Sequence, residues 1–331
     1  MTAFVPATPL FSSLLMLSTF LSLSSSHWLL LWLGLELNLL SFIPMIMFSM
    51  NLQETEGAIK YFMTQAMGSA LILLGGMILL NSFIPMKLSS ILIIGGTMYK
   101  LGLAPCHFWL PNTMAAISWF SCLILSTWQK IIPLMILITL HMHETTFMLI
   151  MSGALSSLIG GMGGMNQSAL RPLLAYSSVG HLGWMICAST ISSSSAIIYF
   201  MSYILIISPI IMLFATKNIF SSIQMFSISK SKISFQLSTA MLFMSLGGLP
   251  PLFGFFPKWI AIQSLASSNS ILLPLILIIG ALMNLYFYLI LSFPMILNTL
   301  SFKKFHKMTK MSILSFSSIF LMICPTSLFL I

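Results

Sequence analysis

Long apolar stretches separated by short polar segments run along the whole chain of 331 residues. A helix needs roughly 20 mainly apolar residues to cross the hydrocarbon layer of a membrane. The pattern contains about eleven stretches close to that length. They are residues 4–23, 28–48, 59–80, 88–110, 117–140, 146–165, 173–191, 196–215, 237–259, 271–293 and 311–330. The period-two alternation of a membrane β-barrel is absent from them, so each is predicted to be an α-helix.

Composition points to the same class of protein. Apolar residues make up 58% of the chain and charged residues 5%, with 13 basic residues against 4 acidic ones, whereas soluble domains carry about a quarter charged residues. A soluble enzyme, a secreted disulfide scaffold and a disordered chain are therefore excluded. The scattered cysteines predict neither a disulfide framework nor a metal site. No cleavable signal or arginine-rich transit segment is expected, and no nucleic-acid partner.

The distribution of basic residues predicts the orientation in the membrane. If the N-terminus lies on one side of the membrane, each connection that follows an even-numbered span lies on that same side. They carry Lys60, Arg171, Lys217, Lys230, Lys232, Lys303, Lys304, Lys307 and Lys310, against Lys87 alone on the other side. Because cytoplasmic-type loops collect lysine and arginine, the N-terminus is predicted on that side, which is the matrix in a mitochondrion. The C-terminus is then predicted on the opposite side.

Four ionisable residues fall inside the predicted spans: Glu36, Lys100, Lys130 and Lys258. Each costs roughly 3 kcal/mol or more at the centre of a membrane helix. One interpretation is that they are buried pairs that fix helix register. Three lysines cannot all be neutralised by one glutamate, however. An ammonium group without a counter-charge exchanges its proton more readily in apolar surroundings, which favours a proton relay.

Two predicted spans contain helix breakers close to a lysine. Gly102 and Pro105 interrupt span 88–110, and Gly248 with Pro250 interrupts span 237–259. Either break could be an ordinary proline kink. The two spans are the fourth of five in each half, however, which is the pattern of inverted repeats with discontinuous helices in transporters. The predicted organisation is a first repeat at 1–142, a second, inverted repeat at 143–294, and a basic loop with a C-terminal helix at 295–331.

Histidines give a weaker signal. His107 lies in the first broken span and His181 in span 173–191, and each is either a proton relay or a hydrogen-bonded core residue. His141, His143 and Glu144 are not expected to bind metal, because residues two apart do not share a helix face.

With these residues in view, the chain resembles the antiporter-like proton-translocating subunits of respiratory complex I, the mitochondrial NADH:ubiquinone oxidoreductase, and most closely their subunit 2 type. The likeness extends over essentially the whole chain, and Pro257-Lys258-Trp259 is its most specific part. The motifs that carry it are Leu35-Glu36-Leu37-Asn38, Lys100 with Leu103 to Pro111, Trp128-Gln129-Lys130, Tyr176-Ser177-Ser178 with His181 to Trp184, and Gly248 to Trp259.

The resemblance implies two inverted five-helix repeats and a role for each intramembrane charge. Glu36 and Lys100 would form a modulating pair, Lys130 would continue a hydrophilic axis, and Lys258 would be the terminal lysine on the outlet side. Bacterial relatives begin with three further helices, so a neighbouring subunit is expected to cover the edge of the bundle that their absence leaves open.

The resemblance also implies the setting. The chain would be a multi-pass protein of the inner mitochondrial membrane, in contact with other membrane-arm subunits, antiporter-like neighbours among them, and with lipids. It would hold no cofactor, and NADH, FMN, iron–sulfur clusters and ubiquinone would be bound by other subunits. Two alternatives stay open at this point: a free-standing cation/proton antiporter, and a purely structural membrane subunit.

Overall fold

The computed structural model describes residues 7–48, 51–80, 86–140, 145–228, 233–267 and 271–301. Within these ranges the chain is helical, with one isolated antiparallel bridge between Ala169 and Ser221 and no strand. The predicted all-α class is thus confirmed for the described residues. Six helical segments among them are long and apolar enough to cross a membrane. The predicted span 311–330 and the residues His141, His143 and Glu144 lie outside the described ranges.

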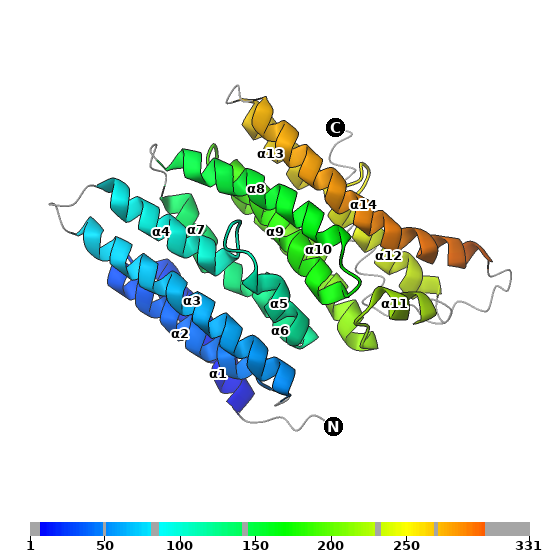
Figure 1. Ribbon diagram of the computed structural model, residues 1–331, viewed down its shortest axis with the longest axis horizontal. Helices are drawn as coiled ribbons and strands as arrows, with labels where there is room; N and C mark the ends of the chain where they lie inside the picture. The colour runs from blue at the N-terminus through cyan, green and yellow to red at the C-terminus, as the bar shows by residue number, and fades with distance from the viewer. Residues whose placement is uncertain are drawn as a thin grey trace. The chain divides into compact units, whose positions relative to one another are not determined.

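The chain divides into two compact units, Met1–Ser152 and Gly153–Ile331. In the first unit α1 packs along α2, and α3 packs along α4 (Figure 1). The helices of this unit are α1 (Ala7–Ser24), α2 (Trp28–Ile46), α3 (Leu52–Leu79), α4 (Met86–Leu101), α5 (Trp109–Ala116), α6 (Trp119–Ser126), the 3-10 turn η1 (Trp128–Lys130) and α7 (Ile131–Thr139).

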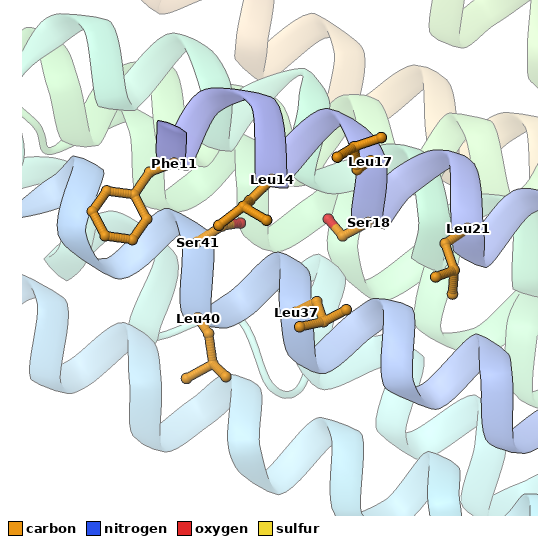
Figure 2. Close-up of a pocket in the computed structure, with 8 residues that line it drawn as sticks. All are labelled: Phe11, Leu14, Leu17, Ser18, Leu21, Leu37, Leu40 and Ser41. Atoms are coloured by element: carbon orange, nitrogen blue, oxygen red, sulfur yellow. The ribbon is translucent and has the colours of Figure 1, made fainter. Parts of the chain in front are cut away.

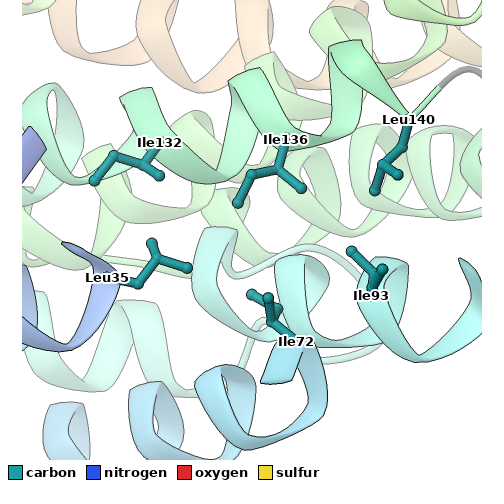
Figure 3. Packing of buried hydrophobic residues seen from close by; sticks show 6 residues of the cluster. All are labelled: Leu35, Ile72, Ile93, Ile132, Ile136 and Leu140. Carbon is teal, nitrogen blue, oxygen red and sulfur yellow. The ribbon is translucent and has the colours of Figure 1, made fainter. Parts of the chain in front are cut away.

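A compact apolar cluster joins four segments of the first unit. Its side chains come from α2, α3, α4 and the α7 segment and point toward one another (Figure 3). They are Leu35, Ile72, Ile93, Ile132, Ile136 and Leu140. Lipid tails are as apolar as these side chains, so close packing and not exclusion from water holds such helices together in a membrane.

The exposed face of α1 has the polarity of a membrane helix. Leu17 and Phe20 are 63% and 62% exposed, whereas Ser18 and Ser22 are buried. Each of these serines donates its hydroxyl to the carbonyl three residues before it, which satisfies the polar group inside the helix. On this part of α1, large apolar side chains face outward and the two serines face inward.

A groove of about 310 Å³ lies between α1 and α2 on this face (Figure 2). Leucines and Phe11 make up most of its wall, and Ser18 and Ser41 add two hydroxyls. Its lining residues are Phe11, Leu14, Leu17, Ser18, Leu21, Leu37, Leu40 and Ser41.

The second unit is built around α9, whose side chains are almost all buried. Glycines bring its neighbour α8 very close: a Cβ atom added at Gly160 would lie 2.5 Å from the backbone nitrogen of Gly180. The helices that lie wholly or mainly in this unit are α8 (Thr146–Met165), α9 (Leu170–Ser189), α10 (Ser193–Lys217), α11 (Ser222–Ile228), α12 (Ile233–Gly247), α13 (Phe255–Ala266) and α14 (Leu272–Ser301).

Both predicted helix breaks are present. α4 ends at Leu101, and Gly102 adopts a φ of +73° before the chain enters α5 at Trp109. α12 ends at Gly247, and Gly248 adopts a φ of +80° before α13 begins at Phe255. Only glycine adopts such left-handed backbone angles readily, and the prolines that follow cannot continue a helix.

A third interruption lies in span 117–140, which we expected to be one continuous helix. The α-helix stops at Ser126, and the 3-10 turn η1 precedes α7. Pro133 has no N–H group to bond to the carbonyl of Gln129, so the α-helical ladder lacks one rung at this turn. Thr127 adds to the interruption because its hydroxyl donates to the carbonyl of Leu123 at 2.7 Å.

Candidate functional site

Each of the three intramembrane lysines lies beside one of these interruptions. Lys100 is in the last turn of α4, Lys130 ends η1, and Lys258 is in the first turn of α13. Their exposed fractions are 7%, 3% and 7%. None of the three side chains therefore extends out to a surface. Irregular backbone at membrane depth is tolerated only inside protein or along a cavity, and here it surrounds the charged groups.

Glu36 is the charged partner of Lys100. The half-buried carboxylate interacts electrostatically with the ammonium group, but the two do not form a direct ion pair within the described chain. Gln65 donates its amide to the backbone carbonyl of Lys100 at 3.3 Å. Gly68 leaves room for the lysine stem, because a Cβ atom there would lie 2.9 Å from the lysine Cγ. The two charges are thus close enough to interact electrostatically without a direct ion pair in the part of the chain that the structure describes.

Lys258 reaches back across the second break. Its ammonium group donates to the carbonyl of Gly247, the last residue of α12, at 2.6 Å. A cation at a helix C-terminus is stabilised by the unsatisfied carbonyls and the helix dipole. Gly248 is needed for this arrangement, since a Cβ atom there would lie 2.7 Å from the lysine Nζ. Lys100, by contrast, lies before the first break, in the last turn of α4.

His181 lies in a buried polar cluster of the second unit. Its Nδ1 is 3.0 Å from the hydroxyl of Tyr199 on α10. A cavity of about 10 Å³, roughly room for one water molecule, lies against this cluster. Ser245 before the second break and Gly254 after it also line the cavity. His181 is thus connected to the broken segment that precedes Lys258.

His107 is held differently. Its Nδ1 faces the carbonyl of Pro105 at 3.3 Å, and its ring lies 4.1 Å from that of Phe108. Both contacts are made inside the break itself. The geometry of His107 therefore supports a packing role for this residue as well as it supports a relay.

Several polar residues of the two clusters were not among the sequence candidates. In the first unit they are Gln65, Asn38, Gln129 and Tyr61, and the last three form a hydrogen-bonded chain. In the second unit, Tyr288 on α14 lies beside Ser177, and Tyr203 lies beside Ser178. For the second unit, the sequence signal that could have identified these residues is the spacing of Tyr199 and Tyr203. They are four positions apart and so lie on one face of α10.

No group of three metal-ligating side chains is found among the described residues. The side chains gathered at the two clusters are amines, a carboxylate, an imidazole and hydroxyls. Such groups can hold a proton and pass it on.

Comparison with known proteins gives the family. The family described as "NADH:quinone oxidoreductase/Mrp antiporter, TM" matches residues 25–284. Among solved structures, respiratory complex I from Thermus thermophilus contains a similar chain, with a TM-score of 0.84 and 22% identity over 97% of this chain and 78% of the other. The Mrp complex from Dietzia contains another, with a TM-score of 0.74 and 14% identity over 85% and 58%. These structures show the shared fold.

Curated relatives are much more similar in sequence. NADH-ubiquinone oxidoreductase chain 2 of Lumbricus terrestris is 46% identical over 86% of this chain and 85% of its own length. The protein of the same name from Locusta migratoria is 42% identical over 97% of each chain. This similarity extends across both units and all the described breaks. The chain therefore belongs to the NADH-ubiquinone oxidoreductase chain 2 family.

Proposed function

We propose that this chain is a proton-translocating subunit in the membrane arm of respiratory complex I, with Glu36, Lys100, Lys130 and Lys258 as its proton-carrying groups and His181 as an accessory relay. The observation that carries the proposal is the burial of three lysines at three separate interruptions of membrane helices. Purely structural charges would not need irregular backbone beside each of them.

The first transfer step depends on the distance between Glu36 and Lys100. When the carboxylate is close, the ammonium form of the lysine is favoured, and when it withdraws, release of the proton becomes easier. The indirect contact between the two groups in this structure is compatible with such a movement. The released proton would pass by way of Lys130 toward Lys258 in the second unit.

Transfer against a membrane potential requires an external source of free energy. Moving one charge costs about 2.3 kcal/mol per 100 mV. In the proposal this free energy comes from NADH oxidation and ubiquinone reduction in other subunits, which would hold the FMN and iron–sulfur clusters. The role of this chain is limited to proton movement.

The finer topology is part of the proposal. It has about eleven spans, arranged as two inverted five-helix repeats and a C-terminal helix, in the inner mitochondrial membrane. The broken α4–α5 and α12–α13 segments, each with a lysine beside the break, support the repeats. The excess of lysine and arginine in the connections on one side of the membrane predicts an N-terminus in the matrix and a C-terminus in the intermembrane space.

The groove between α1 and α2 is the proposed contact with a neighbouring membrane-arm subunit. It is apolar and open (Figure 2), so another apolar membrane helix would fit it without burying charge.

A free-standing cation/proton antiporter shares this fold, as the family description and the Mrp structure indicate. The relatives above 40% identity favour the complex I subunit instead. Sodium-for-proton exchange by the purified chain alone in liposomes would support the antiporter.

Glu36→Gln is the variant that tests the proposal. We expect the rate of NADH-driven proton uptake by the assembled complex in vesicles to fall about tenfold, because the lysine loses the charge that controls its proton. The control is Glu56→Gln, which removes an exposed carboxylate paired with Lys60 and should leave the rate unchanged. An assembled Glu36→Gln complex that pumps at the wild-type rate would refute the modulating role.

A further inference from the structure

A chain of hydrogen bonds connects α2, which carries Glu36, and α3 with the 3-10 turn η1, which carries Lys130. The hydroxyl of Tyr61 on α3 donates to Oε1 of Gln129 at 3.3 Å. Nε2 of the same glutamine donates to Oδ1 of Asn38 on α2 at 2.9 Å. The side-chain amide of Gln129 therefore accepts a hydrogen bond from α3 and donates one to α2. We call these three residues the glutamine bridge.

The glutamine bridge is held in place by its surroundings. Asn38 and Tyr61 are buried, with exposed fractions of 3% and 2%. The Tyr61 ring packs edge-on against Phe42 at 5.2 Å and Trp109 at 5.9 Å. A buried amide that loses its partner is costly, so each bond of the bridge is favoured over an open arrangement.

Glu36 and Lys130 each lie within two residues of the bridge, and Lys100 is connected to it less directly, through Trp109. Asn38 follows Glu36 by two positions on α2, and Gln129 directly precedes Lys130. Trp109, which packs on Tyr61, donates its indole N–H to the carbonyl of Tyr99 at 3.0 Å, and Tyr99 directly precedes Lys100. A movement of α2 that changes the position of Glu36 also moves Asn38, because one turn of helix is rigid.

We propose that Gln129 is a positioning residue, whose amide holds the 3-10 turn carrying Lys130 in register with α2 and α3 and so transmits a shift of the Glu36 helix to Lys130. This inference rests on the proposed function. A short 3-10 stretch between two α-helical segments, as η1 is, often marks a hinge. Without the bridge, η1 would no longer follow α2.

The test is Gln129→Met in the assembled complex. Methionine fills a similar volume without hydrogen bonds. We expect the rate of NADH-driven proton uptake in vesicles to fall about threefold to tenfold, the factor that one hydrogen bond contributes, with an unchanged KM for ubiquinone. The matched control is Gln53→Met, an exposed glutamine in the first turn of α3, which should leave the rate unchanged.

A double variant separates transmission from a general packing effect. Asn38→Leu breaks the same bond from the other side, so the double variant Asn38→Leu with Gln129→Met should be no slower than the slower single variant. Multiplicative losses would overturn the inference. If Gln129→Met complexes do not assemble, Tyr61→Phe removes one hydroxyl of the bridge and should slow uptake about threefold.

A further comparison distinguishes this inference from the proposed function. Wild-type uptake by Gln129→Met together with a loss of uptake by Lys130→Met would overturn the bridge alone. Wild-type uptake by both variants would overturn the bridge and the proposed role of Lys130.

Discussion

Replacing Lys100 by methionine should lower the rate of NADH-driven proton uptake by the assembled complex at least tenfold. The variant keeps the aliphatic stem that packs beside Gly68 and removes the amine that lies before the first break. Moving a charge through this buried segment without a protonatable group costs roughly 3 kcal/mol or more, which exceeds the 1.4 kcal/mol of a tenfold change. The measurement is proton uptake into vesicles, with oxidation of NADH by a water-soluble acceptor as the reference for the redox subunits.

The matched control for this prediction is Lys60→Met. Lys60 is on the same unit but exposed, where it pairs with Glu56 four residues earlier at 2.5 Å. Such surface pairs contribute little, so uptake should stay at the wild-type rate. A Lys100→Met complex that assembles and pumps normally would reject the role of this lysine.

Replacing Gly254 by alanine should prevent assembly of the second unit. The new methyl group would overlap with the backbone carbonyl oxygen of Ser245. A backbone carbonyl in a helix cannot rotate away from a clash as a side chain can. Overpacking typically costs about 1–3 kcal/mol and occasionally more. The carbonyl belongs to the last turn of α12, two residues before the acceptor of Lys258. The amount of intact complex on a native gel measures the effect.

Gly95→Ala provides the comparison. The added methyl group would have no described atom within 4 Å, and alanine is favoured over glycine inside a helix. The Gly95→Ala complex should accumulate to wild-type levels. Equal accumulation of the Gly254→Ala complex would show that the two ends of the second break are not in tight contact.

The helix breaks show what the sequence could predict. Gly102 and Gly248 are glycines followed by proline within a few residues, a local signal that needs no tertiary information. The interruption at η1 was missed because its causes, Thr127 and Pro133, lie on either side of it and Pro133 follows by several residues. The span count, the repeats and the orientation remain predictions.

The partners of the charged groups were harder to foresee. The closeness of Glu36 and Lys100 came from family resemblance and not from spacing, because nothing local relates α2 to α4. The tyrosines around His181 and the glutamine bridge depend on how each helix is rotated about its axis. α9 also shows why hydropathy alone is insufficient, since a helix enclosed by others can be rich in polar residues.

A map of ordered water around Lys100, Lys130 and Lys258 in the assembled complex tests the central claim most directly. The account predicts water within hydrogen-bonding distance of each ammonium group and in the small cavity beside His181. Lysine side chains sealed in dry apolar packing, with no water within hydrogen-bonding distance of any ammonium group, would contradict it.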